Sequence, residues 1–62
     1  LNSGFGIIEV FNISGQLIAR ELIYRHQIDM LMENLHLNTG IYTYKYVQTN
    51  GFTITDKLAI VN

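Results

Sequence analysis

The residues that could carry chemistry are few. Asp29 and Glu33 form the nearest pair of carboxylates in the sequence, and a general acid–base pair would need them to share a cleft with separated pKa values. His26 and His36 show no H-x-x-x-H or carboxylate spacing that would assemble a metal site. We therefore interpret all four as solvated surface groups. The sequence predicts no catalytic residue, no cofactor and no metal.

The hydroxyl side chains also lack the context of a nucleophile. Ser14 lies in Asn-Ile-Ser-Gly rather than in a G-x-S-x-G turn. Asn12 to Ser14 matches the N-x-[ST] glycosylation pattern, but that pattern is common by chance and a tight turn explains Asn12. Nothing here indicates an enzyme.

A row of tyrosines has two interpretations. Tyr42, Tyr44 and Tyr46 are spaced two apart and therefore share one face of a predicted strand. Exposed aromatic rings on a strand can stack on sugars or on nucleobases. Tyr42, however, follows a leucine-x-x-glycine turn, as in the tyrosine corner of sandwich domains, where the hydroxyl bonds back to the chain. We favour core and corner packing over a binding face.

Length and charge limit the function further. The chain has 62 residues, so we expect one domain over residues 1–62 with a small core. It has no cysteine and hence no disulfide framework. Four Lys and Arg against five Asp and Glu give a formal charge of −1 without a basic block, which argues against nucleic-acid binding. No apolar run approaches the roughly 20 residues of a membrane helix, and the start lacks the pattern of a signal peptide.

The elements that would position these residues begin with a predicted hairpin. Residues 7–11 and 16–23 are rich in β-formers, and residues 12–15 between them favour a turn. Residues 16–23 also contain helix formers, but eight residues without a cap make a marginal helix. We expect residues 1–6 to end a loop.

The register of this hairpin depends on the length of its loop. A two-residue loop would set Glu9 opposite Arg20 and Phe11 opposite Ile18. A three-residue loop would instead set Val10 opposite Ile18. Both registers stay open.

The middle of the chain is less regular. Residues 24–27 predict a polar connection, and residues 28–31 alternate in a way that predicts a short strand. Residues 32–36 fit either a looped extension or one helical turn, which would place Leu31 and Leu35 on the same side.

A second hairpin is predicted around Asn50 and Gly51, because Asn-Gly between β-rich runs is a strong turn signal. We prefer a three-residue loop with Gly51 in the left-handed conformation, since a slip of one residue would move every side chain to the other face. This register gathers the bulky groups into the pairs Tyr46 with Ile54 and Tyr42 with Leu58. Asp56 would then mark a bulge or an edge.

Together the hairpins predict an all-β fold with no helix long enough to cover a sheet. The economical architecture is a small antiparallel Ig-like β-sandwich whose opening strand is missing. An exposed edge strand would favour a homodimer or strand exchange.

Three motifs carry a resemblance to a known family. They are V-F-N-I-S-G-Q-L-I in residues 10–18, L-N-T-G-I-Y in residues 37–42, and Q-T-N-G-F through T-D-K-L-A-I-V in residues 48–61. In this order and spacing the chain resembles the type A C-terminal sorting domain of type IX secretion cargo from Bacteroidetes-like bacteria. The family's opening Y-P-N-P segment and first strand are absent, and residues 30–37 form a longer stretch than the family usually has.

The resemblance implies a non-catalytic, Ig-like domain at the end of an exported protein. Such domains enter the periplasm, are recognised by the outer-membrane secretion machinery, and are commonly removed by a sortase as the cargo reaches the cell surface or the medium. The implied recognition residues lie on the matching motifs: Gly40, Tyr42, Asn50, Gly51, Lys57 and Leu58. Lys57 is the best candidate for direct contact, because its charged head should be exposed between buried neighbours.

Two other functions remain as alternatives. The first is a carbohydrate-binding or adhesive β-sandwich module of a surface protein, which requires Tyr44 and Tyr46 to be exposed. The second is a plain Ig-like spacer between two domains.

Overall fold

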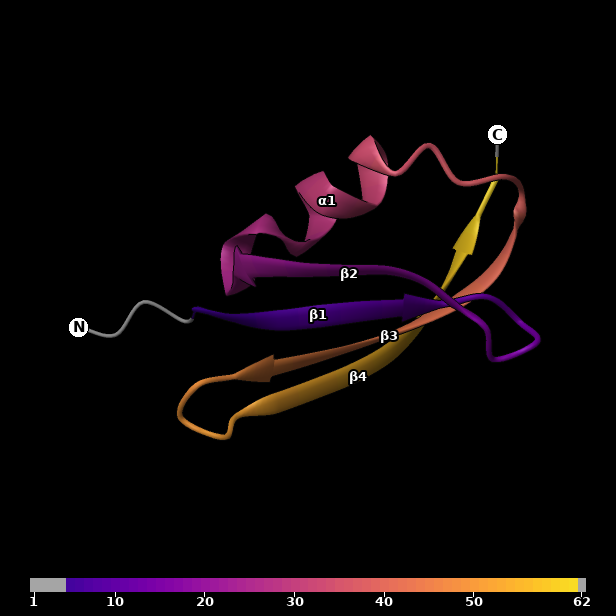
Figure 1. Ribbon diagram of the computed structural model, residues 1–62. Coiled ribbons are helices and arrows are strands. Elements are labelled where there is room, and N and C mark those ends of the chain that lie inside the picture. Colours follow the sequence, from indigo (N-terminus) through magenta and orange to yellow (C-terminus); the bar gives the residue numbers. More distant parts are fainter. Residues whose placement is uncertain (1–4, 62) are drawn as a thin grey trace.

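The computed structural model describes residues 5–61, which form one four-stranded antiparallel sheet and one short helix (Figure 1). The strand order is β2-β1-β3-β4, so β2 and β4 are the edge strands. Residues 1–4 of the loop predicted at residues 1–6 lie outside the described residues, and the prediction is wrong for Phe5 and Gly6, which begin β1. The elements are β1 (Phe5–Phe11), β2 (Leu17–Tyr24), the 3-10 turn η1 (Arg25–Gln27), α1 (Ile28–Asn34), β3 (Gly40–Gln48) and β4 (Thr53–Ile60).

The first hairpin keeps the register of the two-residue loop up to Val10, which lies opposite Ala19, so the alternative pairing of Val10 with Ile18 is wrong. Glu9 lies opposite Arg20, as the two-residue loop required, but a bulge next to the turn sets Phe11 opposite Leu17 rather than Ile18. The Asn12 side chain stabilises the turn, because its Oδ1 accepts hydrogen bonds from the backbone N–H groups of Ser14 and Gln16, both at 3.0 Å. The turn therefore accounts for Asn12.

The strand predicted at residues 28–31 is wrong, because these residues begin α1. Met, Leu and Glu are good helix formers, and Ile28 and Met32, spaced four apart, both turn a buried side toward the sheet. The helical alternative for the following residues is correct, with Leu31 and Leu35 both packed against the core. The expectation that no helix would be long enough to cover the sheet is also wrong, because Ile28 and Met32 of α1 belong to the buried core.

The second hairpin has the predicted register. Tyr46 lies opposite Ile54 and Tyr42 lies opposite Leu58. Gly51 has φ 95°, a left-handed conformation that glycine adopts without a steric penalty. Asp56 lies on the edge strand, in a stretch where the β3–β4 register runs without a bulge.

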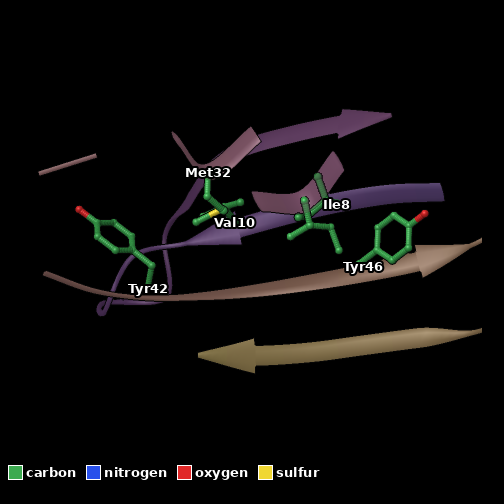
Figure 2. Close-up of a cluster of buried hydrophobic side chains, with 6 residues drawn as sticks. Ile8, Val10, Met32, Tyr42 and Tyr46 are labelled. Carbon is green, nitrogen blue, oxygen red and sulfur yellow. The ribbon is translucent and has the colours of Figure 1, made fainter. Parts of the chain in front are cut away.

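The core lies between α1 and the sheet face that we call the inner face. Ile8 and Val10 of β1, Tyr42 and Tyr46 of β3, and Ile28 and Met32 of α1 make up the buried cluster (Figure 2). The predicted small antiparallel all-β class is thus confirmed. Within residues 5–61 all strands belong to one sheet, and α1 supplies the layer over its inner face.

One glycine in β1 permits the close approach of β3. A Cβ atom at Gly6 would overlap the backbone of Val47 and Gln48. Gly6 is therefore a packing requirement of the β1–β3 pair rather than a flexible point.

Candidate recognition surface

Three of the predicted recognition residues gather where β3 begins and β4 ends. The Tyr42 hydroxyl donates a hydrogen bond of 2.8 Å to the backbone carbonyl of Asn38, which confirms the predicted corner. A Cβ atom at Gly40 would lie 3.6 Å from Cε1 of the Tyr42 ring, an ordinary contact. Leu58 lies opposite Tyr42 on the inner face and is half-buried. Tyr42 thus has a structural role at this end of the sheet, and Gly40 lies next to its ring.

Asn50 and Gly51 lie at the other end of β3, in the turn to β4. The Asn50 side-chain oxygen accepts a hydrogen bond of 2.9 Å from the backbone N–H of Phe52. The Gly51 N–H donates to the carbonyl of Gln48, also at 2.9 Å. These two residues shape the turn, and they do not form one patch with Gly40 and Tyr42.

Lys57 lies on the opposite face of β4 from Leu58, which we call the outer face. It is exposed, as predicted, and stands opposite Thr43 of β3. It also lines a shallow cavity of about 350 Å³ beside the first turn, together with Phe11, Ile13 and Ile41. The structure therefore separates the six predicted residues into two ends and two faces.

The rest of the outer face mixes charge and apolar surface. Glu9 and Arg20 form an ion pair, in which Nε of Arg20 donates a hydrogen bond of 3.3 Å to Oε2 of Glu9. Both side chains are partly exposed. Lys45 lies opposite Glu9 on the next strand. Ile7 of β1 lies between Leu22 of β2 and Val47 of β3, both of which are exposed.

Sequence reasoning missed a groove on the inner face. This β4 groove, of about 530 Å³, lies between α1 and β4. Its apolar lining comes from Ile28, Met32, Leu37, Leu58 and Ile60, and its polar lining from Asp29, Glu33, His36 and Tyr44. The four-residue spacing of Asp29 and Glu33 would have placed both on one side of a helix, but residues 28–31 were predicted as a strand.

The electrostatics of the groove are acidic. Burial raises the pKa of the Tyr44 hydroxyl above its usual 10.0, and the carboxylates of Asp56 and Asp29 raise it further. Asp56 is directly opposite Tyr44 on β4. Its Oδ1 accepts a hydrogen bond of 2.8 Å from the backbone N–H of Lys57.

Tyr46 is enclosed in the core. Its side chain is 0% exposed, and its hydroxyl donates across β1 to the carbonyl of Ile23 on β2 at 3.3 Å. Burial raises the pKa of Tyr46, and Arg25 acts weakly in the opposite direction. Tyr46 therefore offers no exposed ring for stacking, while Tyr44 is half-buried in the groove.

Metal ligation and membrane spanning find no support in the described part of the chain. No group of three or more His, Cys, Asp or Glu residues within residues 5–61 could hold a metal ion. No helix there is long and apolar enough to span a membrane.

Comparison with known proteins agrees with the motifs. The sequence profile of the secretion system C-terminal sorting domain matches residues 2–61. No curated protein and no solved structure matches the chain. The profile covers nearly the whole sequence, including the Tyr42 corner and the Gly51 turn, and the chain therefore belongs to the family of type IX secretion C-terminal sorting domains.

Proposed function

We infer that the chain, as a member of this family, is a sorting signal for type IX secretion, which implies export to the cell surface or the extracellular space. We propose that it is the non-catalytic address label of a larger cargo protein of a Bacteroidetes-like bacterium. The cargo would cross the periplasm, and the domain would be the type A, Ig-like form. The match over residues 2–61 is the observation that carries this proposal.

The exposed side chains of β4 are the candidate contacts for the secretion machinery. Lys57 extends from the outer face, with Thr53 and Thr55 on the same side of the strand. The edge of β4 has no neighbouring strand among residues 5–61, so a partner could add a strand there. Of the six predicted residues we assign direct contact to Lys57 and leave Leu58, Gly40, Tyr42, Asn50 and Gly51 as supports of the surface.

The test is a fusion of this domain, with its native upstream residues, to the C-terminus of a periplasm-directed fluorescent reporter in a bacterium with a type IX system. We expect the reporter at the surface or in the medium, and we expect this export to be lost when the secretion system is deleted. Reporter that stays in the periplasm, attached to a folded domain, would contradict the proposal.

The contact at Lys57 has a matched control. Lys57→Ala and Thr55→Lys should lower export, whereas Lys45→Ala removes an exposed lysine from the same face of β3 and should not. Equal export of all three folded variants would remove Lys57 and the outer face of β4 from the recognition surface.

Two further partners belong to this proposal. A sortase would remove the domain, which a shift in reporter mass after export would detect. An exposed edge strand could also pair with a second copy in a homodimer, which sedimentation of the purified chain would reveal.

The alternative carbohydrate-binding function depends on exposed tyrosines. Tyr46 is fully buried and Tyr44 is half-buried, so the row lacks the open platform that stacking on sugars needs. Titration of the chain with polysaccharide, followed by tyrosine fluorescence, tests whether Tyr44 alone binds sugar. A saturable change in fluorescence that Tyr44→Ala abolishes would support the carbohydrate-binding function.

A further inference from the structure

The open edge of β4 and the β4 groove are continuous with each other. Leu58 and Ile60 of β4 line the groove, and the backbone on the far side of this strand has no neighbouring strand within the described residues. An unpaired strand edge is a template for an extended peptide. A strand added there would direct every second side chain to the inner face, beside the groove.

The β4 groove is lined by carboxylates and by neither lysine nor arginine. Asp29 and Glu33 line the groove, and Asp56 lies opposite its lining residue Tyr44, so three of the five acidic residues in the chain are at or next to it. None of the four Lys and Arg, all of which the structure describes, lines it. The ion pair that the structure shows among residues 5–61 joins Glu9 to Arg20 on the outer face, so the groove carboxylates stay without a basic partner in this fold.

The register of β4 defines what would fit. Ile54, Asp56 and Leu58 are the consecutive inner-face positions of this edge strand, and they are apolar, acidic and apolar. Residues directly opposite in adjacent strands have their side chains in contact, and opposite charges there are favourable. The complementary strand therefore has apolar, basic and apolar residues at the facing positions.

We propose that the β4 groove and the edge of β4 bind an extended segment of a partner protein whose groove-facing residues are apolar, basic and apolar. The basic residue lies opposite Asp56 and within the field of Asp29 and Glu33. A second copy of this chain is a poorer occupant, because antiparallel pairing of two β4 strands about Asp56 would oppose two carboxylates, and like charges directly opposite are destabilising.

This inference goes beyond the sorting function and does not rest on it. Its readout is binding in solution, whereas the sorting function is read from export, so either can fail alone. Both could involve the open edge of β4, but they depend on different side chains, since Lys57 lies on the outer face and Asp56 on the inner face.

The experiment uses a pair of capped synthetic peptides. The first has the pattern threonine–valine–threonine–lysine–threonine–valine–threonine, and the second has glutamate in place of lysine. Each is titrated into the ¹⁵N-labelled chain while amide shifts are followed. We expect the lysine peptide to shift amides of β4 and α1 and to bind at least roughly fivefold more tightly than the glutamate peptide, the factor that a cross-strand charge pair of about 1 kcal/mol gives.

Charge reversal makes the test specific. Asp56→Lys should invert the preference, so that the glutamate peptide binds more tightly, and Asp56 is exposed, so the variant should keep the dispersed spectrum of the folded chain. Glu21→Lys makes the same change at the inner-face position of the other edge strand, β2, and should leave the preference unchanged. A double variant, Asp29→Asn with Glu33→Gln, should weaken binding of the lysine peptide alone.

Three results would overturn the proposal. The first is equal affinity of both peptides for the unaltered chain. The second is a set of shifted amides confined to β2 or the outer face. The third is a shift of the β4 amides that depends on protein concentration without peptide, which would assign the edge to a second copy.

Discussion

The inner face of the sheet has a covered half and an open half, and both use the same kinds of side chain. Over β1, Ile28 and Met32 of α1 close a core in which Ile8 is fully buried. Along β4, equally apolar Leu58 and Ile60 remain half-buried beside the groove. The difference indicates that helix placement, rather than side-chain polarity, decides which apolar residues stabilise the fold and which stay available to a partner.

The largest expected effect compares two tyrosines on the same strand and the same face. Tyr46→Ala should lower the free energy of unfolding by about 3–5 kcal/mol, the usual cost of truncating a buried aromatic residue. Tyr44→Ala should lower it by much less, since its ring is half-exposed in the groove. Urea unfolding of both variants measures the difference, and equal losses would show that the two halves are packed alike.

A smaller effect on stability is expected at the Tyr42 corner, where β3 begins. Tyr42→Phe keeps the ring but removes the 2.8 Å hydrogen bond to the Asn38 carbonyl. We expect a loss of about 1 kcal/mol in unfolding free energy, since a net intramolecular hydrogen bond contributes about that much. A variant as stable as the parent would indicate that water replaces the hydroxyl.

The pH dependence of stability should report on the covered half. Burial raises the pKa of Tyr46 in the folded chain above its ordinary 10.0, so the unfolded chain releases this proton first. The stability from this group is complete below pH 10.0 and is lost as pH rises through the raised pKa. Tyr46→Phe should therefore make the alkaline decline of stability shallower in denaturant titrations from neutral pH upward.

Tyr44 contributes to the same decline, because its pKa is raised as well. Tyr44→Phe is the matched variant in the open half. If only Tyr44→Phe changed the alkaline slope, the contribution assigned to the buried Tyr46 would be wrong.

The smallest expected effect is at Gly40. Because a Cβ atom there meets the Tyr42 ring only at ordinary contact distance, Gly40→Ala should change the unfolding free energy by no more than about 0.5 kcal/mol. Gly51→Ala is the contrasting variant, because the left-handed φ of 95° is unfavourable for any residue with a Cβ atom. It should lower the unfolding free energy by about 1 kcal/mol or more. A stable Gly40→Ala domain that is not exported would indicate that the secretion machinery contacts this residue.

Much of the β structure was predictable, because its signals are local. The Asn50-Gly51 turn and the alternation of tyrosines specified the second hairpin, and the leucine-x-x-glycine turn indicated the Tyr42 corner. The first hairpin was less determined, since a bulge near Phe11 mixes the two registers. The strand prediction at residues 28–31 was wrong because so short an alternating segment fits both a strand and the first turn of a helix.

The sequence alone thus determined the family, the β class, the corner and the register of the last hairpin, because each depends on residues close together in the chain. The tertiary structure decided where α1 lies, and with it which apolar side chains are covered. It also placed Asp29 and Glu33 of α1 in one groove with Tyr44 of β3, which lies opposite Asp56 of β4. No local sequence pattern predicts that α1 and β4 lie close together, because the path of a helix over a sheet depends on packing between segments distant in sequence.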